Sequence, residues 1–316
     1  MQKEIIKALP SNPKKTLQQL RVRTQVCSQR YAQESQRFMV KYSIQESSPL
    51  GDVDAALATE LNALFAAGEQ RHKLDTLYYS VRHRLNLRDV DFREAAAAKA
   101  GVRLATDVSA RDPVPSKEVF CLVADLLKAT PTPAQIWTAA WALLTFDLYC
   151  RPSDLTAVRV QDVHMLKRKA PMITFFPANR DLISKTNTQD DTIPISNRPG
   201  MAEILRALVA GKSPTCRILP MSLSQIKKEL APLLLQNFTP HMLRHGGASL
   251  DGVNGATVEA IAARGRWATM SAVSRYRKPG RYLRALAAMD PKRKKRGEEL
   301  KSSLGFKVAE LLLKLN

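Results

Sequence analysis

The chain has 316 residues, and its 49 Lys and Arg outnumber 29 Asp and Glu, giving a formal net charge of +20. Its 45% hydrophobic content argues against a purely structural basic protein, and its length allows two domains with separate cores. A folded protein this basic usually binds a polyanion, and nucleic acid is the commonest one. We therefore expect double-stranded DNA as the partner.

The basic residues are concentrated in two stretches. Residues 5–33 hold six Lys or Arg and no acid, and residues 264–296 hold twelve against the single acid Asp290. The second stretch alone accounts for more than half of the net charge, so we expect DNA contacts from it. The candidates are Arg264, Arg266, Arg275, Arg277 and Lys278.

The cysteines give no metal or disulfide signal. Cys27, Cys121, Cys150 and Cys216 lie far apart and form no Cys-x-x-Cys or Cys/His ligand spacing. We expect a reducing compartment and no metal. The chain also lacks a run of about 18 apolar residues and a signal-peptide core, so we expect no membrane partner and no secretion.

The first hundred residues show helical patterns. Apolar spacings of three and four, or helix-permissive composition, predict helices over residues 17–42, 53–65 and 74–85. The Ser-Ser-Pro-Leu-Gly segment at 47–51 separates the first two. Asp, Ser and Pro cluster over residues 105–116 and mark a boundary. We expect a small helical domain over residues 1–105.

The second part predicts further helices around two short strands. Residues 117–127 and 133–148 have helical patterns, and residues 172–176 and 192–195 are β-type runs joined by a polar loop. Helices are predicted again over residues 201–210, 222–236, 241–250, 257–263 and 269–276. The fold class expected is mainly α with a small antiparallel β-sheet, an α+β domain.

One short motif has the chemistry of an anion site. His241 and Arg244 are three residues apart, so on a helix they share a face and can reach one anion. Trp267 and Tyr276 follow in a very basic context, which makes the tyrosine a candidate nucleophile. Taken singly, each residue has an ordinary alternative, such as a solvated helix face or an aromatic core residue.

Together these motifs resemble the tyrosine recombinases, the phage-integrase family. The segment Arg151–Leu155 is similar to the family's Arg-x-x-Glu/Asp-Leu sequence, and His241 and Arg244 match its His-x-x-Arg box. Trp267 precedes Tyr276 by nine residues, the family's spacing to its nucleophile. Residues 106–290 resemble the catalytic domain and residues 1–105 the helical core-binding domain. Residues 291–316 are then a basic tail with a C-terminal amphipathic helix.

The resemblance implies a set of site residues. It assigns catalytic roles to Arg151, Lys185, His241, Arg244, Trp267 and Tyr276, and supporting roles to Asp154 and His245. Some positions depart from the family pattern. Tyr149 and Cys150 replace the frequent Thr-Gly, and residues 264–267 replace Leu-Gly-His. The alternatives to Lys185 are Lys167, Lys169 and Arg180, and those to Tyr276 are Tyr149 and Tyr282.

The activity implied is cleavage and rejoining of DNA through a 3′-phosphotyrosyl intermediate, without metal, ATP or another cofactor. The resemblance further implies a site-specific recombinase or integrase of mobile-element origin that is a monomer or dimer in solution and a homotetramer on DNA. Two alternatives are a DNA-binding relative that no longer cuts and a tyrosine topoisomerase.

The last residues leave two questions open. The Pro-Lys-Arg-Lys-Lys-Arg run at 291–296 is either a nuclear-import signal or a phosphate-binding tail, so we expect a nuclear location in a eukaryote and a cytoplasmic one otherwise. Beyond it an apolar stripe recurs at helical spacing, which could pack on its own domain. The resemblance implies the alternative, docking on a neighbouring protomer in a tetramer on DNA, and we predict the latter. The members of the stripe are Leu304, Val308, Leu311, Leu312 and Leu315.

Overall fold

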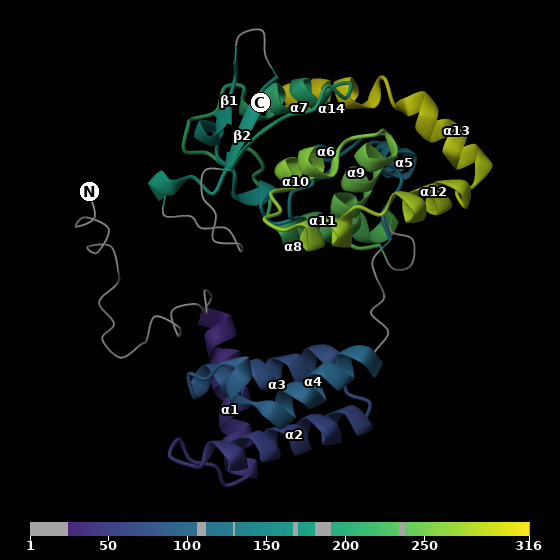
Figure 1. Ribbon diagram of the computed structural model, residues 1–316. Helices are drawn as coiled ribbons and strands as arrows, with labels where there is room; N and C mark the ends of the chain where they lie inside the picture. The colour runs from purple at the N-terminus through teal and green to yellow at the C-terminus, as the bar shows by residue number, and fades with distance from the viewer. Residues whose placement is uncertain are drawn as a thin grey trace. The chain divides into compact units, whose positions relative to one another are not determined.

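The computed structural model describes residues 25–105, 112–128, 130–166, 170–180, 191–233 and 238–315. The chain divides into two compact units, residues 1–109 and 110–316, each with its own apolar core (Figure 1). The described part is mainly helical and contains one three-stranded antiparallel sheet, which confirms the predicted fold class. None of the described helices is long and apolar enough to cross a membrane.

The first unit is a small helical bundle of α1 (Gln25–Lys41), α2 (Leu50–Ala66), α3 (Arg71–Arg84) and α4 (Arg93–Ala105). Helix α1 packs on α3 and α2 packs on α4. The buried carboxylate of Asp54 in α2 accepts hydrogen bonds from the backbone N–H groups of Arg93, Glu94 and Ala95. Because these groups have no partner within their own helix, Asp54 fixes where α4 begins.

The second unit is built around α6 (Pro133–Leu148), a helix buried over most of its surface. Thr132 and Gln135 form a capping box at its start, and Pro133 occupies the first helical position. Helix α5 (Ser116–Leu126) packs beside it. The indole of Trp141 donates a hydrogen bond of 3.1 Å to the carbonyl of Pro152, which ties the loop after α6 to the core.

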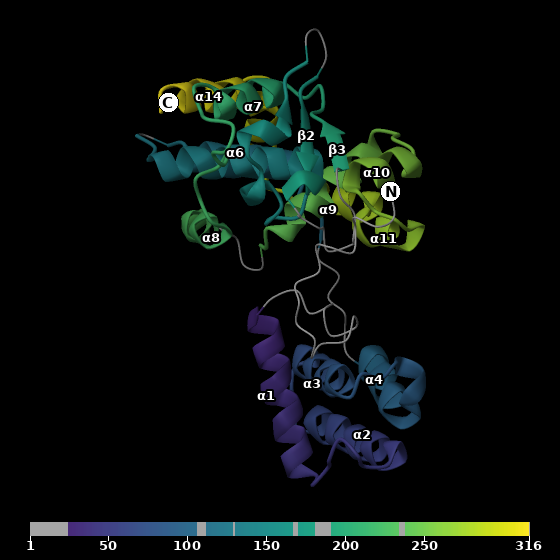
Figure 2. The same cartoon turned by 90° about the vertical axis from the view of Figure 1, so that its left-hand side faces the viewer.

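The sheet consists of β1 (Val163–His164), β2 (Met172–Phe175) and β3 (Asp191–Pro194), in that order and antiparallel (Figure 2). Ile173 pairs with Ile193, and both are buried in the core of the unit. The sequence predicted β2 and β3 but not β1, because two residues are too few to show an alternating pattern.

The remaining helices of the core follow in chain order: α7 (Met201–Val209), α8 (Leu223–Leu230), α9 (His241–Val253), α10 (Val258–Gly265), α11 (Met270–Tyr276) and α12 (Pro279–Ala287). The prediction of a single helix over residues 222–236 is wrong in its end point. Helix α8 stops at Leu230 and a 3₁₀ turn, Ala231–Leu233, follows. Pro232 explains the break, since proline has no N–H to donate.

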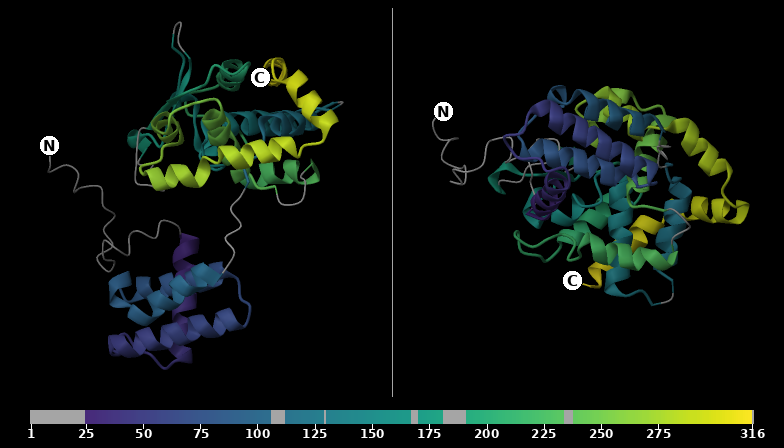
Figure 3. Two further views of the ribbon diagram at one scale, coloured as in Figure 1. Left: turned by 45° about the vertical axis from the view of Figure 1, so that its right-hand side comes forward. Right: turned by 90° about the horizontal axis from the view of Figure 1, so that it is seen from below.

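The segment predicted as a basic tail is a helix, α13 (Pro291–Leu300), packed on α5. Arg293 forms ion pairs with Glu118 and Asp125, and Arg296 also pairs with Asp125. Figure 3 follows this yellow part of the chain through α12 and α13 to the C-terminal helix. Two of the five basic side chains in residues 291–296 therefore hold the domain together.

The C-terminal helix α14 (Leu304–Leu313) packs on α7 of its own chain, beside which it lies in Figure 1. It buries Leu304, Val308 and Leu312 in the main core. Gly200 and Gly305 bring the two helices together, because a Cβ added to Gly305 would lie 2.4 Å from the carbonyl oxygen of Pro199. In the structure the C-terminal helix thus packs on its own domain. This differs from the predicted docking on a neighbouring chain.

Candidate active site

Two glycines allow α9, the helix of the His-x-x-Arg motif, to pack closely against α6. A Cβ on Gly247 would lie 2.0 Å from the carbonyl oxygen of Phe146, and one on Gly246 would lie 2.3 Å from that of Val114. Any larger residue would push α9 away from the end of α6. The close approach places Arg244, which is on the same helix, near the loop that carries Arg151.

Arg244 is the buried cation at the centre of the site, with 1% of its surface exposed. Its Nη2 donates a hydrogen bond of 2.9 Å to the carbonyl of Gly265, while its Nε and Nη1 find no acceptor among the described residues. Burial lowers the pKa of Arg244 to about 10; Tyr276 opposes this shift, and the charges of Arg266 and Arg151 add to it. A buried guanidinium with unsatisfied donors is suited to an anion.

Tyr276, at the end of α11, packs against this guanidinium and against two aromatic side chains. Its ring centre is 4.9 Å from that of Trp267, nearly parallel to it, and 4.7 Å from that of His245. The Cζ of Arg244 lies 4.8 Å from the Tyr276 ring and 4.7 Å from the Trp267 ring. The indole Nε1 of Trp267 also lacks a hydrogen-bond partner within the described part of the chain. Unsatisfied donors thus gather around the predicted nucleophile.

Arg151 and Asp154 lie in the tight loop after α6. Asp154 accepts a hydrogen bond from the backbone N–H of Arg151, and its Oδ2 lies 3.9 Å from Nη1 of the same residue. The same oxygen is only 2.6 Å from Nη2 of Arg266. The predicted Arg151–Asp154 pair is therefore present but long, and Arg266 is the closer partner. After Pro152 the chain forms a turn and then a single 3₁₀ turn, Leu155–Ala157.

The structure thus brings together six of the predicted site residues: Arg151, Asp154, Arg244, His245, Trp267 and Tyr276. His241 is the first residue of α9, about one turn before Arg244, and is half-buried. Lys185 lies outside the described residues, as do Lys167 and Lys169. The roles of these residues in catalysis stay predictions.

The two rival tyrosines have structural partners. The hydroxyl of Tyr149 donates a hydrogen bond to the carboxylate of Asp251. The hydroxyl of Tyr282 accepts a hydrogen bond of 2.9 Å from the backbone N–H of Ser116 and donates one to its Oγ. Both rings are fully buried. Tyr276 is the half-buried one of the three and the one that lies beside Arg244.

The predicted DNA-contact residues differ in how buried and how hydrogen-bonded they are. Arg264 donates to the backbone carbonyls of Asp147 and Pro194 and forms an ion pair of 2.8 Å with the Asp147 carboxylate. It therefore ties α10 to the end of α6 and to β3. Arg275 is exposed on α11, whereas Arg277 and Lys278 are half-buried beside it. A DNA contact by any of them stays a prediction.

A buried charge network behind the site was missed at the sequence level. Asp147, only 1% exposed, pairs with Arg198 as well as Arg264, and Arg198 also pairs with Asp251. Burial raises the pKa of Asp251 to about 6; Arg264 opposes this shift and Asp147 adds to it. The available signal was Asp147 itself, the one charged residue in the sequence of α6.

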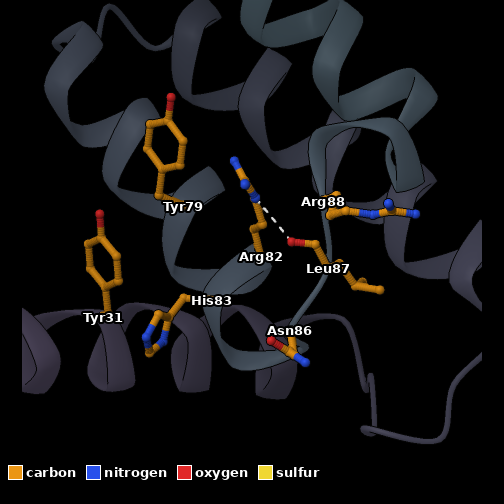
Figure 4. A pocket seen from close by; sticks show the side chains of 7 residues that line it. All are labelled: Tyr31, Tyr79, Arg82, His83, Asn86, Leu87 and Arg88. Atoms are coloured by element: carbon orange, nitrogen blue, oxygen red, sulfur yellow. Dashed lines mark hydrogen bonds between the residues drawn. The ribbon is translucent and has the colours of Figure 1, made fainter. Parts of the chain in front are cut away.

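The first unit contains a separate cavity of about 490 Å³ (Figure 4). Arg82 crosses it and donates a hydrogen bond of 3.0 Å to the carbonyl of Leu87. The cavity includes none of the predicted catalytic residues. Its lining consists of Tyr31, Tyr79, Arg82, His83, Asn86, Leu87 and Arg88.

No group of three or more His, Cys, Asp or Glu side chains among the described residues is arranged to hold a metal ion.

No family model and no curated protein matches this chain. Solved structures do match it. XerH site-specific recombinase bound to a palindromic difH substrate is 12% identical over 82% of this chain and 78% of its own, with a TM-score of 0.56. The Tn1549 transposon integrase in complex with transposon right end DNA is 12% identical over 86% and 98%, with a TM-score of 0.56.

A lambda integrase dimer bound to a COC′ core site is 16% identical over 81% of this chain and 89% of its own, with a TM-score of 0.53. These proteins are tyrosine recombinases. The chain therefore has the tyrosine-recombinase fold, as its motifs predicted.

Proposed function

We propose that this protein is a site-specific DNA recombinase or integrase that cleaves and rejoins DNA with Tyr276 as nucleophile. The observation that carries the proposal is the packing of Tyr276 against Arg244, a buried guanidinium whose Nε and Nη1 have no acceptor in the described structure. A DNA phosphate beside the Tyr276 hydroxyl would supply those acceptors and be held for attack.

The arginines suit the charge that develops during phosphoryl transfer. Attack on a phosphodiester concentrates negative charge on its non-bridging oxygens, and preorganised cationic donors stabilise that charge. Arg244 is held in place by the Gly265 carbonyl, and Arg151 lies close enough to affect its pKa. We assign these two arginines to the phosphate, with His241 and the indole N–H of Trp267 as further donors.

The leaving 5′-oxygen needs a proton, and Lys185 is our candidate acid. A substrate with a 5′-bridging phosphorothiolate removes that need, because a thiolate leaves without protonation. Cleavage by Lys185→Ala should therefore be restored on this substrate. Failure of that rescue, combined with rescue of Lys169→Ala, would transfer the role to Lys169.

The covalent intermediate accounts for rejoining without ATP. Attack by Tyr276 forms a 3′-phosphotyrosyl bond and releases a 5′-hydroxyl, so the energy of the broken phosphodiester is retained. A 5′-hydroxyl from a second duplex then attacks the phosphotyrosine, releases the tyrosine and exchanges the strands. Such exchange requires several protomers on two duplexes, and we propose a homotetramer on DNA. A mobile-element origin, with nuclear location in a eukaryotic host, is part of the same proposal.

The test is covalent trapping on a nicked suicide duplex, from which the short fragment that carries the released 5′-hydroxyl diffuses away. Wild-type protein should form an adduct that resists denaturant, and Tyr276→Phe should bind the duplex without forming it. Tyr282→Phe is the matched control and should still form the adduct. If wild-type protein binds DNA but never forms the adduct, it is a non-cutting relative. Relaxation of a single supercoiled DNA without exchange between two duplexes would indicate a topoisomerase.

A further inference from the structure

Arg266 has an unusual backbone conformation for its residue type. It follows the last residue of α10 with φ 55° and ψ 48°, in the left-handed region. Glycine is the usual residue at this position of a helix end, because a side chain is disfavoured there. Strained residues of this kind cluster at functional sites. The side chain of Arg266 therefore needs an explanation.

The guanidinium of Arg266 is buried and only partly satisfied. Its side chain is 6% exposed, its Nη2 lies 2.6 Å from Oδ2 of Asp154, and its Cζ lies 4.1 Å from the centre of the Phe175 ring. Its Nε and Nη1 have no hydrogen-bond partner in the ranges that the structure describes. Unsatisfied donors on a buried charged group are costly, so a bound acceptor would stabilise this arrangement.

The charges around Arg266 point to the kind of acceptor. Arg266 and Arg151 share the single oxygen Oδ2 of Asp154, and both lie close enough to act on Arg244. One shared carboxylate cannot neutralise three guanidinium groups. The excess is positive, and the unsatisfied N–H groups of Arg244 and Arg266 occur in the same part of the fold. An anion with several oxygens fits this set of donors.

We propose that Arg266 is a third arginine of the phosphate site. Its Nη2 is anchored on Asp154, and one of its two remaining donor groups, Nε or Nη1, donates to a non-bridging oxygen of the phosphate held by Arg151 and Arg244. The identification of that phosphate as DNA rests on the proposed function. Binding of the anion by Arg266 does not require cleavage.

The first experiment compares a charged and an uncharged scissile group. Arg266→Gln is assayed for single-turnover cleavage of a suicide duplex, either natural or with a methylphosphonate at the scissile position. On the natural phosphate we expect a loss of roughly 100-fold relative to wild type, as for removal of one charge-stabilising donor. On the neutral methylphosphonate the two proteins should cleave at similar rates. Equal losses on both substrates would mean that Arg266 acts only by holding Asp154, and would overturn the proposal.

Two control variants accompany this comparison. Arg206→Gln removes an equal charge from an exposed position on α7, outside the predicted DNA-contact residues, and should behave as wild type on both substrates. Arg266→Gly replaces the strained residue with the one that favours its φ, which offsets part of the stability lost with the Asp154 ion pair. Loss of cleavage by Arg266→Gly well below its melting temperature then reflects the missing guanidinium and not misfolding.

The second experiment is independent of catalysis. Inorganic phosphate should raise the melting temperature of wild-type protein and of Tyr276→Phe, and raise that of Arg266→Gly much less. An equal response in Arg266→Gly would overturn the proposal. If wild-type protein forms no DNA adduct but shows this Arg266-dependent response, the proposed recombinase function fails and the anion site at Arg266 stands.

Discussion

The guanidinium carbon of Arg244 lies 4.8 Å from the centre of the Tyr276 ring, although the two residues are 32 positions apart in the sequence. The contact depends on two close approaches. Gly247 lets α9 lie against the end of α6, and the carbonyl of Gly265 holds Arg244 from the start of the loop that leads to Trp267. The packing of α9 and the hydrogen bond to Gly265 thus place the cation beside the candidate nucleophile.

Arg244→Lys tests whether cleavage requires only the positive charge of Arg244 or also the planar shape of its guanidinium. Lysine keeps the positive charge but loses the planar fork that reaches both the Gly265 carbonyl and an anion. We expect suicide-duplex cleavage to fall by roughly 100- to 1,000-fold, while binding in a gel shift changes only severalfold. The matched control is Arg206→Lys at an exposed position on α7, which should cleave normally. Near-normal cleavage by Arg244→Lys would remove Arg244 from the charge-stabilising role.

Gly247→Ala should destabilise the second unit, because the new Cβ would lie 2.0 Å from a backbone oxygen that cannot move independently of α6. We expect a loss of about 2–3 kcal/mol in the free energy of unfolding. Urea unfolding followed by tryptophan fluorescence measures it, since all three tryptophans are in this unit. Gly280→Ala, with no atom within 4 Å of its new Cβ, should lose less than about 0.5 kcal/mol.

The C-terminal helix offers a paired test of its packing on its own chain. Leu312 is 2% exposed and Leu313 is 57% exposed, so alanine at these two adjacent positions removes the same atoms from opposite environments. Leu312→Ala should lower the free energy of unfolding by about 2–4 kcal/mol, and Leu313→Ala by less than about 0.5 kcal/mol. Similar small effects at both positions in urea unfolding would mean that α14 is not docked on α7 in solution.

Asp125 should make the second unit sensitive to acid. Burial alone would raise its pKa, but hydrogen bonds from Arg296, Lys128 and Arg293 outweigh burial and lower the pKa to about 2. A carboxyl whose folded pKa is below its ordinary value of 3.8 stabilises the fold above about pH 4 and loses that effect as the pH falls toward 2. Thermal unfolding between pH 5 and 2.5 should show this dependence.

Asp125→Asn removes the titrating group, so its melting temperature should fall less steeply over the same pH range while starting lower at pH 5. Glu299→Gln, also an acid-to-amide change, on the exposed surface of α13, is the control and should follow wild type. Parallel curves for Asp125→Asn and wild type would show that the ion pairs of α13 do not contribute to acid stability.

DNA binding should weaken steeply with salt. A footprint that neutralises about eight phosphates predicts a slope near −7 in a plot of log K against log salt, from about −0.9 per contact. Titration by fluorescence anisotropy from low to physiological salt measures this slope. A flat dependence would mean that the +20 net charge serves a purpose other than contact with the DNA backbone.

The sequence by itself determined the type and order of most elements. Helix α6 begins and ends where its helical pattern predicts, and β2 and β3 appear within one residue of their β-type runs. These features depend on local periodicity and on caps made by neighbouring residues, which a single segment contains in full. The motifs whose resemblance to the tyrosine recombinases predicted Arg151, Arg244, Trp267 and Tyr276 as one site are likewise a property of the sequence.

Only the tertiary structure decided which partner each side chain meets. Arg264 and Arg266 are two positions apart and equally basic, yet one is hydrogen-bonded to Asp147 and the other reaches Asp154 with two donors unsatisfied. Their contacts come from segments more than a hundred residues earlier, so no local pattern could distinguish them. The same reason explains α13 and α14: a basic run becomes a packed helix, and an apolar stripe is covered in cis, because α5 and α7 present complementary surfaces that form only when the chain is folded.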